Sequence, residues 1–359
     1  MESVVKNRAY INGIGLISPQ KTAENTDFLS DIVEYKADYL KAIDPNFKAW
    51  IDPLAARRMS RLIKMGIVAA KTALADAHCE MPDAIITGTG LGSVEDTEKI
   101  LAGMIAGETL TNPTPFMQST YNTISSQIAI NLKCHGYNST YVHRAFSFES
   151  SLFDALMQLA EGTAEKVLAG GVDEMTPVHL GIVRRLGDWK MQPESNLKVL
   201  ESVTPGALAG EGAGFFLLGN ASGENSYCAL SDVRTFYKPG TPLETAQHLL
   251  SFLTSNYLAT HQVDLVITGM SGDRRYDGIY ESVCREYFPE VPVAYYKHLC
   301  GEYHTSSAFA LWLAANILKR QSVPDALLLN APVTGNLKTI LIWNHYRNVN
   351  HALILLEVI

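Results

Sequence analysis

The sequence predicts an α/β fold, with a parallel or mixed sheet that helices cover on both faces. Apolar stretches typical of buried strands alternate along the chain with segments whose apolar residues recur at helical spacing. This alternation occurs twice, on either side of a stretch rich in Gly, Asn and Ser at 218–226. We therefore expect an internal duplication, with an N-terminal half at 1–222 and a C-terminal half at 223–359.

The first half has four segments with the pattern of buried strands and three with the pattern of amphipathic helices. The strand segments are rich in apolar and β-branched residues, and glycine turns follow two of them. We expect strands at 8–17, 83–93, 139–146 and 164–174. We expect helices at 56–77, 122–133 and 149–162. Ser147 precedes the last helix and is its expected N-cap, because a hydroxyl there accepts a hydrogen bond from the first turn.

The second half repeats the pattern with the same kinds of segment. Its strand segments are short and apolar, and its helices begin near Pro or Ser and contain few helix breakers. We expect strands at 227–238, 264–272, 325–332 and 351–359. We expect helices at 241–259 and 306–320.

Composition and charge exclude several classes of function. The 359 residues carry 29 basic and 37 acidic side chains, a net charge of −8, without a basic block that would bind nucleic acid. No apolar run reaches the roughly 18–20 residues of a membrane span, and the N-terminus lacks an apolar signal core, so we expect a cytoplasmic protein. The five cysteines are scattered singly, which argues against disulfides and a zinc site. We expect no metal and no cofactor.

Six segments, in order along nearly the whole chain, resemble motifs of the β-ketoacyl-acyl-carrier-protein synthases. They are the Arg-rich helix RRMSRLIKMGIVAAKTALADA, the Gly-rich strand end IITGTGLGSVEDTE, the segment NPTPFMQSTYNTISSQIAINLKCHG, the strand AEKVLAGGVDEMTP, the turn PGALAGEGAGFFLL and the loop YYKHLCGEYHTSSAFAL. The resemblance implies the duplicated thiolase-like fold, which has five layers in the order α-β-α-β-α. It also implies a role in fatty-acid or polyketide synthesis.

The positions that carry catalysis in this family hold other residues here. Its members use a cysteine at a helix N-terminus to take the acyl chain, two histidines to stabilise the enolate oxygen, and a supporting lysine. Aligned on the AGG strand, the cysteine position is Ala145. The two histidine positions are Gly269 and Glu302, whereas Lys297 and Gly301 are retained. The glycine-rich gate loop of the family is replaced by NHYRNVNHA.

Several neighbouring residues are candidates for other roles. Cys300 and His304, with His298, lie in one short loop and could form a substitute catalytic couple, although their spacing matches no strong metal-ligand pattern. His143 and Arg144 could bind an anion such as a carrier phosphate or a carboxylate.

The remaining polar residues of these motifs have simpler explanations. Ser147 is a possible substitute nucleophile, but an N-cap is the simpler explanation. Glu149 would place a carboxylate favourably at a helix start. Lys297 and Glu302 are expected to form a buried pair and, with Ala145, to border one cavity.

These features favour a non-condensing subunit similar to the chain-length factors of polyketide and aryl-polyene systems. Chain-length factors usually carry Gln at the cysteine position, and this chain carries Ala145. One alternative is an active 3-oxoacyl synthase or acyltransferase that uses Cys300 and His304, and another is a stand-alone acyl-binding homodimer. The expected partners are acyl carrier protein and an intact ketosynthase subunit, or a second copy of this chain. The dimer is expected to form through the strand at 138–145.

Overall fold

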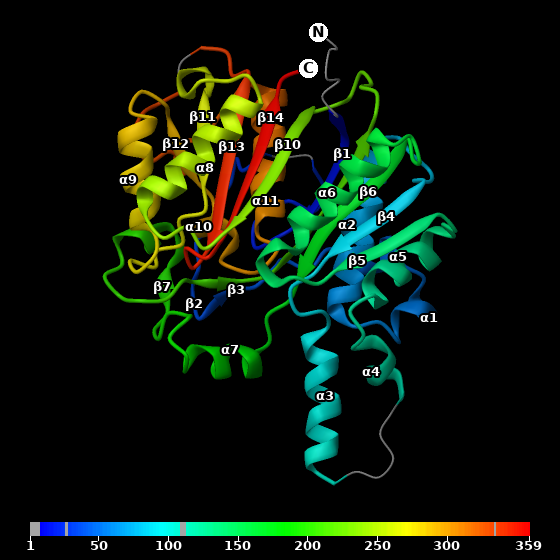
Figure 1. Cartoon of the computed structure of the whole chain (residues 1–359). Coiled ribbons are helices and arrows are strands. Elements are labelled where there is room, and N and C mark those ends of the chain that lie inside the picture. The colour runs from blue at the N-terminus through cyan, green and yellow to red at the C-terminus, as the bar shows by residue number, and fades with distance from the viewer. Residues whose placement is uncertain (1–7, 26–27, 108–112, 334) are drawn as a thin grey trace.

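A mixed ten-stranded sheet runs through the described part of the protein in the computed structural model, which covers residues 8–25, 28–107, 113–333 and 335–359. The strand order is β12-β11-β13-β14-β10-β1-β9-β6-β4-β5 (Figure 1). The strands of the first half are β1 (Ala9–Ile17), β4 (Ala84–Gly88), β5 (Tyr137–Tyr141), β6 (Lys166–Asp173) and β9 (Gly212–Gly219). Those of the second half are β10 (Cys228–Tyr237), β11 (Leu265–Thr268), β12 (Val293–Tyr295), β13 (Thr339–Tyr346) and β14 (Asn350–Glu357).

The two halves of the sheet have the same topology. In the first, β4 is parallel to β5 and β6, and β9 pairs antiparallel with β6 on one side and with β1 on the other. In the second, β11 is parallel to β12 and β13, and β13, β14 and β10 follow in antiparallel order. The halves meet where Ala9, Tyr10 and Ile11 of β1 pair with β10. The boundary expected at 222/223 lies between β9 and β10, and the division into two domains stays a prediction.

Five layers build the core, as the fold prediction requires. The middle layer contains α6 (Ser147–Ala160) and α11 (Ser307–Arg320), which share one apolar core with both halves of the sheet. The outer helices are α2 (Arg61–Asp76) and α5 (Thr123–Leu132) over the first half, and α8 (Pro242–Ser255) and α9 (Gly278–Tyr287) over the second. In α11 every residue from Ser307 to Leu318 is buried, which explains why its sequence is apolar on all faces.

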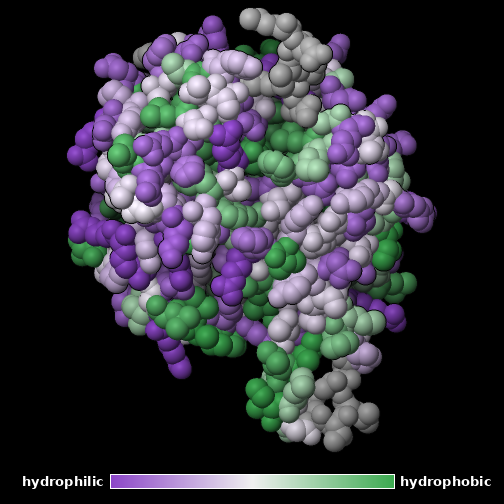
Figure 2. Space-filling model, in the orientation of Figure 1, coloured by the Kyte–Doolittle hydropathy of each residue, from purple (hydrophilic) through white to green (hydrophobic). Residues whose placement is uncertain are grey.

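Two helices project from this body. They are α3 (Val94–Ile105) and α4 (Pro113–Gln118), which form an arm at the bottom of Figure 1. Figure 2 shows that apolar surface gathers on the arm. Its exposed apolar side chains are Leu101, Met104, Ile105, Phe116 and Met117.

The remaining elements are short. Two small strand pairs join β2 (Lys36–Ala37) to β7 (Glu194–Ser195) and β3 (Tyr39–Leu40) to β8 (Ala209–Gly210). The short helices are α1 (Pro53–Ala56), α7 (Pro177–Arg184) and α10 (Lys297–Cys300). The 3-10 turns are Phe47–Ala49, Arg144–Phe146, Asn196–Glu201, Thr260–Gln262 and Asp325–Leu327. No helix in the described ranges is long and apolar enough to span a bilayer.

The strand expected at 325–332 is wrong. The segment begins with the 3-10 turn Asp325–Leu327 and then makes a single bridge, between Leu328 and Ala294. The Asn330 side chain accepts a hydrogen bond from the backbone N–H of Val293 at 2.8 Å and thereby covers the edge of β12. A run of leucines cannot by itself distinguish a buried strand from an irregular segment that packs over an edge.

A substitution that creates a cavity at α11 tests how much the middle layer contributes to the free energy of unfolding. We expect Leu313→Ala to lower the free energy of unfolding by about 2–5 kcal/mol, because Leu313 is fully buried and the site cannot collapse completely. The control Leu243→Ala changes a mostly exposed leucine on α8 and should change stability by less than about 0.5 kcal/mol. Urea denaturation of both variants measures the difference, and equal losses would contradict the layer arrangement.

Candidate functional site

The turn before α6 holds Ala145, the residue that the sequence analysis predicts at the cysteine position of the family. Ala145 lies in the 3-10 turn Arg144–Phe146 and is buried. The Ser147 hydroxyl accepts a hydrogen bond from the backbone N–H of His143 at 2.8 Å and donates one to the Thr89 carbonyl at 2.9 Å. These bonds fix the turn against the loop after β4, and they engage the hydroxyl that was considered as a substitute nucleophile.

The N-cap expected at Ser147 is wrong. Ser147 is the first residue of α6, and the cap position falls on Phe146, which has no side-chain oxygen. The reason is that the 3-10 turn runs directly into the helix, so that Ser147 already has helical backbone angles. Glu149 does lie in the first turn of α6, as expected.

His143 and Arg144 lie on the surface side of this turn. Both side chains are exposed, and the His143 ring stacks on Phe146 with 5.2 Å between ring centres. Arg144 has a φ of 47°, a left-handed conformation that is uncommon for a residue other than glycine. The turn lies near the 297–304 loop, because Ser147 bonds to Thr89 and a β-carbon at the next residue, Gly90, would overlap the His304 ring.

Lys297 and Glu302 form the buried ion pair that the sequence predicts. The Lys297 ammonium lies 2.5 Å from a Glu302 carboxylate oxygen, and both side chains are almost completely shielded from water. Burial raises the pKa of Glu302, and the charge of Lys297 opposes this rise. The pair leaves the lysine without a free charge that could support an enolate.

Of the residues considered for a substitute catalytic couple, Cys300 and His298 are buried and His304 is half-buried. Burial raises the pKa of Cys300 well above that of an ordinary thiol, and its Sγ contacts the Gly301 carbonyl at 3.2 Å. Burial also lowers the pKa of His298 to about 3 and that of His304 to about 4. In the described ranges no hydrogen bond joins Cys300 to His304, so the geometry gives no support to a thiolate nucleophile there.

Other side chains occupy the space beside Gly269, the predicted equivalent of the family's first histidine. A β-carbon at Gly269 would overlap the side-chain oxygen of Asn344 and lie 2.8 Å from the Tyr280 hydroxyl. Tyr280 in turn stacks on His345 with 4.4 Å between ring centres, and its hydroxyl accepts a hydrogen bond from the backbone N–H of His345. An imidazole at 269 therefore has no room without displacement of this group.

Two small cavities lie beside the loop that holds Glu302, the predicted equivalent of the family's second histidine. One of about 20 Å³ is lined by Glu302 and Tyr346, and another of about 20 Å³ is lined by His304 and Tyr346. Substrate pockets usually have about 300–1,000 Å³. Ala145 and Lys297 line neither cavity, so the shared cavity expected for Ala145, Lys297 and Glu302 is absent from these two.

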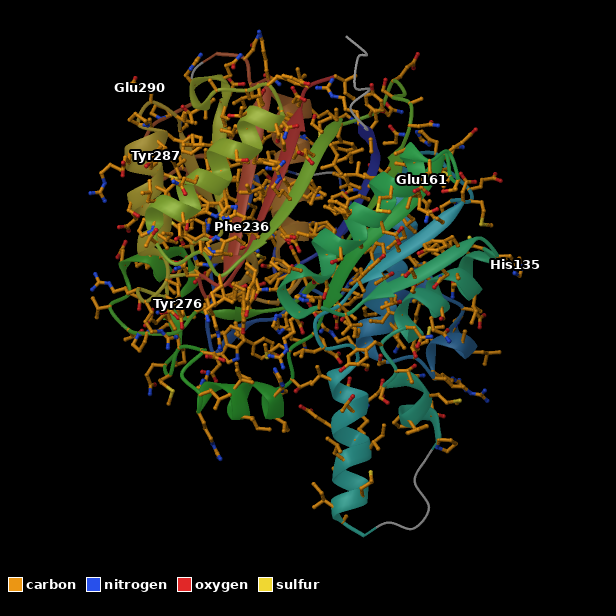
Figure 3. The ribbon with its side chains drawn as sticks, viewed as in Figure 1. His135, Glu161, Phe236, Tyr276, Tyr287 and Glu290 are labelled. Carbon is orange, nitrogen blue, oxygen red and sulfur yellow. The ribbon has the colours of Figure 1, made fainter. Side chains whose placement is uncertain are left out.

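Residues that the sequence analysis did not single out close this site. Trp189 and Tyr346 line both small cavities, and Arg347 forms an ion pair with Asp188 at the same place. Tyr346 and Arg347 lie in the segment NHYRNVNHA, which the sequence analysis places at the gate loop of the family. Nothing in the sequence links Trp189 to this segment. Tyr276 also lines the first cavity, whereas His135 lies exposed at the periphery (Figure 3).

The described residues contain no group of three or more His, Cys, Asp or Glu side chains that could hold a metal ion. The buried acids instead bond to protein donors. Asp173 accepts hydrogen bonds from the backbone N–H of Gly90 at 2.8 Å and of Thr305 at 2.9 Å. These bonds connect the loop after β4 with the start of α11. They account for the buried Asp173 carboxylate without a bound ligand.

Residues 11–223 match the family model described as Beta-ketoacyl synthase, N-terminal domain. The match covers more than half of the chain, and the chain belongs to the β-ketoacyl synthase family. The 3-oxoacyl-[acyl-carrier-protein] synthase 2 of Staphylococcus aureus (strain N315) is 25% identical over 207 residues, which are 52% of this chain and 48% of that protein. The synthase 2 of Rhizobium meliloti (strain 1021) is 23% identical over 253 residues, 59% of this chain and 58% of that protein. The chain thus spans about half the length of these curated relatives.

Solved structures show the same fold over the whole chain. The ishigamide ketosynthase/chain length factor matches with a TM-score of 0.82 at 16% identity, over 99% of this chain and 100% of that one. A β-ketoacyl synthase from Burkholderia phymatum STM815 matches with 0.80 at 15% identity, over 98% and 100%. A ketosynthase in complex with its chain length factor from Xenorhabdus doucetiae matches with 0.77 at 14% identity, over 100% of both chains. These matches establish the thiolase-like ketosynthase fold.

A buried carboxyl at the start of α6 makes stability depend on pH. Burial raises the pKa of Glu149 from 4.5 to about 7, although the Ser307 hydroxyl donates a 2.5 Å hydrogen bond to it. Because the folded chain binds this proton more tightly than the unfolded chain, the stabilisation is fully present below pH 4.5 and is lost as the pH rises through about 7.

We expect wild type to lose on the order of 3 kcal/mol relative to Glu149→Gln between about pH 4 and pH 8. Glutamine is neutral at every pH, and the other carboxyls are the same in both chains, so their contributions cancel. Urea denaturation across this range measures the difference. Glu161→Gln, which changes an exposed acid just after the same helix, should retain the wild-type profile. A difference that is constant with pH would contradict the assignment to Glu149.

Proposed function

We propose that the protein is a cytoplasmic, non-condensing subunit of fatty-acid or polyketide synthesis, similar to a chain-length factor. The observation that carries this proposal is the filled site: Tyr280 and Asn344 occupy the space beside Gly269, and the cavity that Glu302 lines has a volume of about 20 Å³. The likeness to a ketosynthase in complex with its chain length factor supports it. Since the interior beside Glu302 has no room, an acyl chain would contact this subunit at the interface with its partner.

The chemistry of the three replaced positions supports the same proposal. Ala145 has no atom that can form a thioester, and the buried Cys300 remains a thiol because burial raises its pKa. At the second histidine position, an ionised Glu302 would repel a developing enolate oxygen rather than stabilise it. Glu302 instead compensates the buried charge of Lys297.

Acyl carrier protein is the proposed source of the acyl chain, with an intact ketosynthase subunit as the proposed partner. A complex of a type II ketosynthase with its acyl-carrier protein is among the structures with this fold, with a TM-score of 0.79 at 16% identity over 98% of this chain and 99% of that one. On this chain, His143 and Arg144 are exposed where α6 begins, and they are the proposed contacts for a phosphate or carboxylate.

The proposed interface lies along β5, the outermost strand of the first half. β5 pairs only with β4 within the described sheet, so its other edge has backbone groups that an added strand can pair. Tyr137 and Val142 at its two ends are exposed apolar residues, and Ile130 of α5 is exposed as well. An antiparallel β5 from a ketosynthase, or from a second copy, would cover them.

Intact-mass spectrometry after incubation with acyl-loaded carrier protein tests the absence of condensation chemistry. We expect no acyl adduct on wild type and no condensation with malonyl carrier protein. Ala145→Cys restores a thiol at the start of α6 and should give at most acyl loading, because Gly269 and Glu302 still lack the histidine donors.

Cys300→Ala is the matched control in this experiment and should behave like wild type. An adduct on wild type that disappears in Cys300→Ala would overturn the proposal and establish an active acyltransferase that uses the 297–304 loop.

Sedimentation velocity at micromolar concentration tests the interface, with the chain alone and with a ketosynthase that retains Cys, His and His. We expect a dimer in at least one mixture, and Val142→Asp should weaken it about tenfold, or about 1.4 kcal/mol, because the charge is desolvated at the β5 edge. Leu54→Asp, on the exposed helix α1, should leave association unchanged. Association of the chain alone, with none to the ketosynthase, would favour the stand-alone homodimer, and a monomer in both mixtures would contradict the interface.

A further inference from the structure

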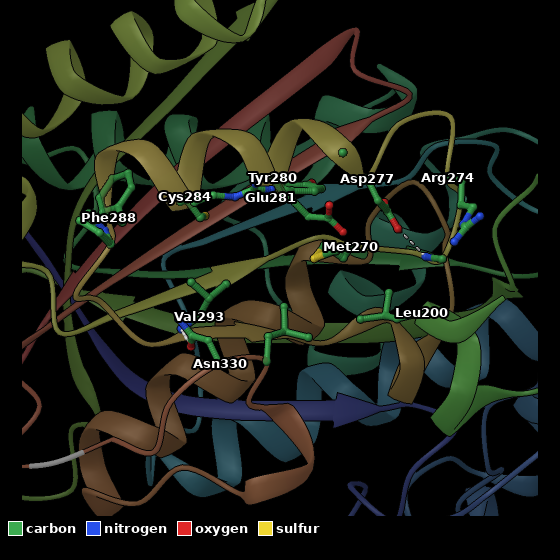
Figure 4. Close-up of a pocket in the computed structure, with 15 residues that line it drawn as sticks. Leu200, Met270, Arg274, Asp277, Tyr280, Glu281, Cys284, Phe288, Val293 and Asn330 are labelled. Carbon is green, nitrogen blue, oxygen red and sulfur yellow. Dashed lines mark hydrogen bonds between the residues drawn. The ribbon is translucent and has the colours of Figure 1, made fainter. Parts of the chain in front are cut away.

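A larger cavity, distinct from the two small ones beside Glu302 and His304, lies on the outer side of the C-terminal half, between α9 and β12. Its volume is about 780 Å³, in the range of small-molecule binding sites. Figure 4 shows α9 along one wall, with Val293 of β12 and Leu200 on the opposite side. The contrast with the cavities of about 20 Å³ beside Glu302 is large. Nothing in the proposed partner role requires an open space here.

The inner wall of this cavity is apolar. Met270, Cys284, Phe288 and Val293 line it and are otherwise buried against the outer core of the second half. Leu329 lines the cavity and is 39% exposed. Because these side chains come from separate segments of the chain, the space between them is a hollow in the packing rather than a groove along one helix. Such a wall favours an aliphatic or aromatic group over water.

Two arginines border the same cavity. Arg274 precedes α9 and Arg285 lies within it, and both side chains are exposed. Neither arginine has an ion pair among residues that the structure describes. A guanidinium without a partner presents its fork of N–H donors to a carboxylate. In Figure 4 Arg274 lies at one end of the cavity and Phe288 at the other, so an anionic head and an apolar tail have separate places.

Two acids also line the cavity. Asp277 accepts hydrogen bonds from the backbone N–H groups of Ser271 at 3.1 Å and Gly272 at 2.7 Å, so its oxygens hold the loop. Glu281 of α9 is exposed and has no such bonds within the described structure. Glu281 would therefore repel an anionic head group. Removal of the Glu281 charge should strengthen the binding of a carboxylate.

One segment separates this cavity from the family site. Ser271, Asp273 and Tyr276 line the small cavity beside Glu302. Met270, Gly272, Arg274 and Asp277 line the large one. The two cavities therefore lie on opposite sides of the segment 270–277, and the large one is not part of the family's acyl site.

A glycine fixes the wall of this cavity. Gly272 has a φ of 79°, and a β-carbon there would overlap the Val199 carbonyl. This close approach holds the turn Asn196–Glu201, and with it Leu200, against the segment 270–277.

We propose that this cavity binds a small amphipathic carboxylate, with its apolar chain against Cys284, Phe288 and Val293 and its carboxylate on Arg274. The proposal is independent of the partner role, because Arg274, Cys284, Phe288 and Val293 lie outside the filled site and outside the β5 edge. Tyr280 borders both places, and the proposal assigns it no role in binding. The recognition chemistry is apolar burial combined with a charge-assisted hydrogen bond from a guanidinium.

Isothermal titration of the purified full chain with dodecanoate, below its micelle concentration, tests this site, and dodecanol is the uncharged comparison. We expect Arg274→Gln to weaken the binding of dodecanoate about tenfold and to leave the binding of dodecanol unchanged. Glu281→Gln should strengthen the binding of dodecanoate. Cys284→Trp fills the cavity and should abolish binding of both probes. Leu329→Glu adds a carboxylate at a partly exposed position and should weaken the binding of dodecanoate. This variant tests the site even if Cys284→Trp fails to fold.

Two control variants exclude adsorption elsewhere on the surface. Ile105→Ser removes the most exposed apolar side chain of the α3 arm, and Arg58→Gln removes an exposed arginine far from α9 in the sequence. Both should bind dodecanoate like wild type. Absence of saturable dodecanoate binding would overturn the proposal, as would binding that Leu329→Glu leaves unchanged or that Ile105→Ser abolishes. Equal loss of dodecanol and dodecanoate in Arg274→Gln would overturn the assignment of the carboxylate.

Discussion

Burial of α11 on every side is the constraint on which the rest of the molecule depends. The helix lies between both halves of the sheet, so it fixes their separation and leaves little space for charged groups nearby. Two buried charged groups that enter this region have compensating partners. Lys297 has Glu302, and Asp173 has the backbone of Gly90 and Thr305. The family scaffold is retained because these interior requirements do not depend on the reaction.

The filled site and the open cavity differ in how completely side chains occupy the space in each. Tyr280, Asn344, Trp189 and Tyr346 occupy the interior that faces Glu302. Behind the segment 270–277, a cavity of about 780 Å³ remains between α9 and β12. Fold alone does not determine function, because function depends on the side chains that line such spaces.

Sequence patterns predicted the layers better than the contents of the site. The strand at 8–17 and the helix at 306–320 were predictable, because continuous burial leaves an apolar pattern in both. The leucines of 325–332 gave the same signal without forming a strand. The ion pair of Lys297 and Glu302 could be predicted because its members are neighbours in the sequence. Trp189 and Tyr346 line the same two cavities but come from distant segments that no local pattern connects.

Gly269 has an evolutionary consequence. A side chain at this position would overlap the side-chain oxygen of Asn344 and crowd the hydroxyl of Tyr280, which stacks on His345. A single substitution to a larger residue therefore meets an immediate steric penalty. Substitution at position 269 is thereby coupled to the side chains at positions 280 and 344, so that the three positions are expected to change together.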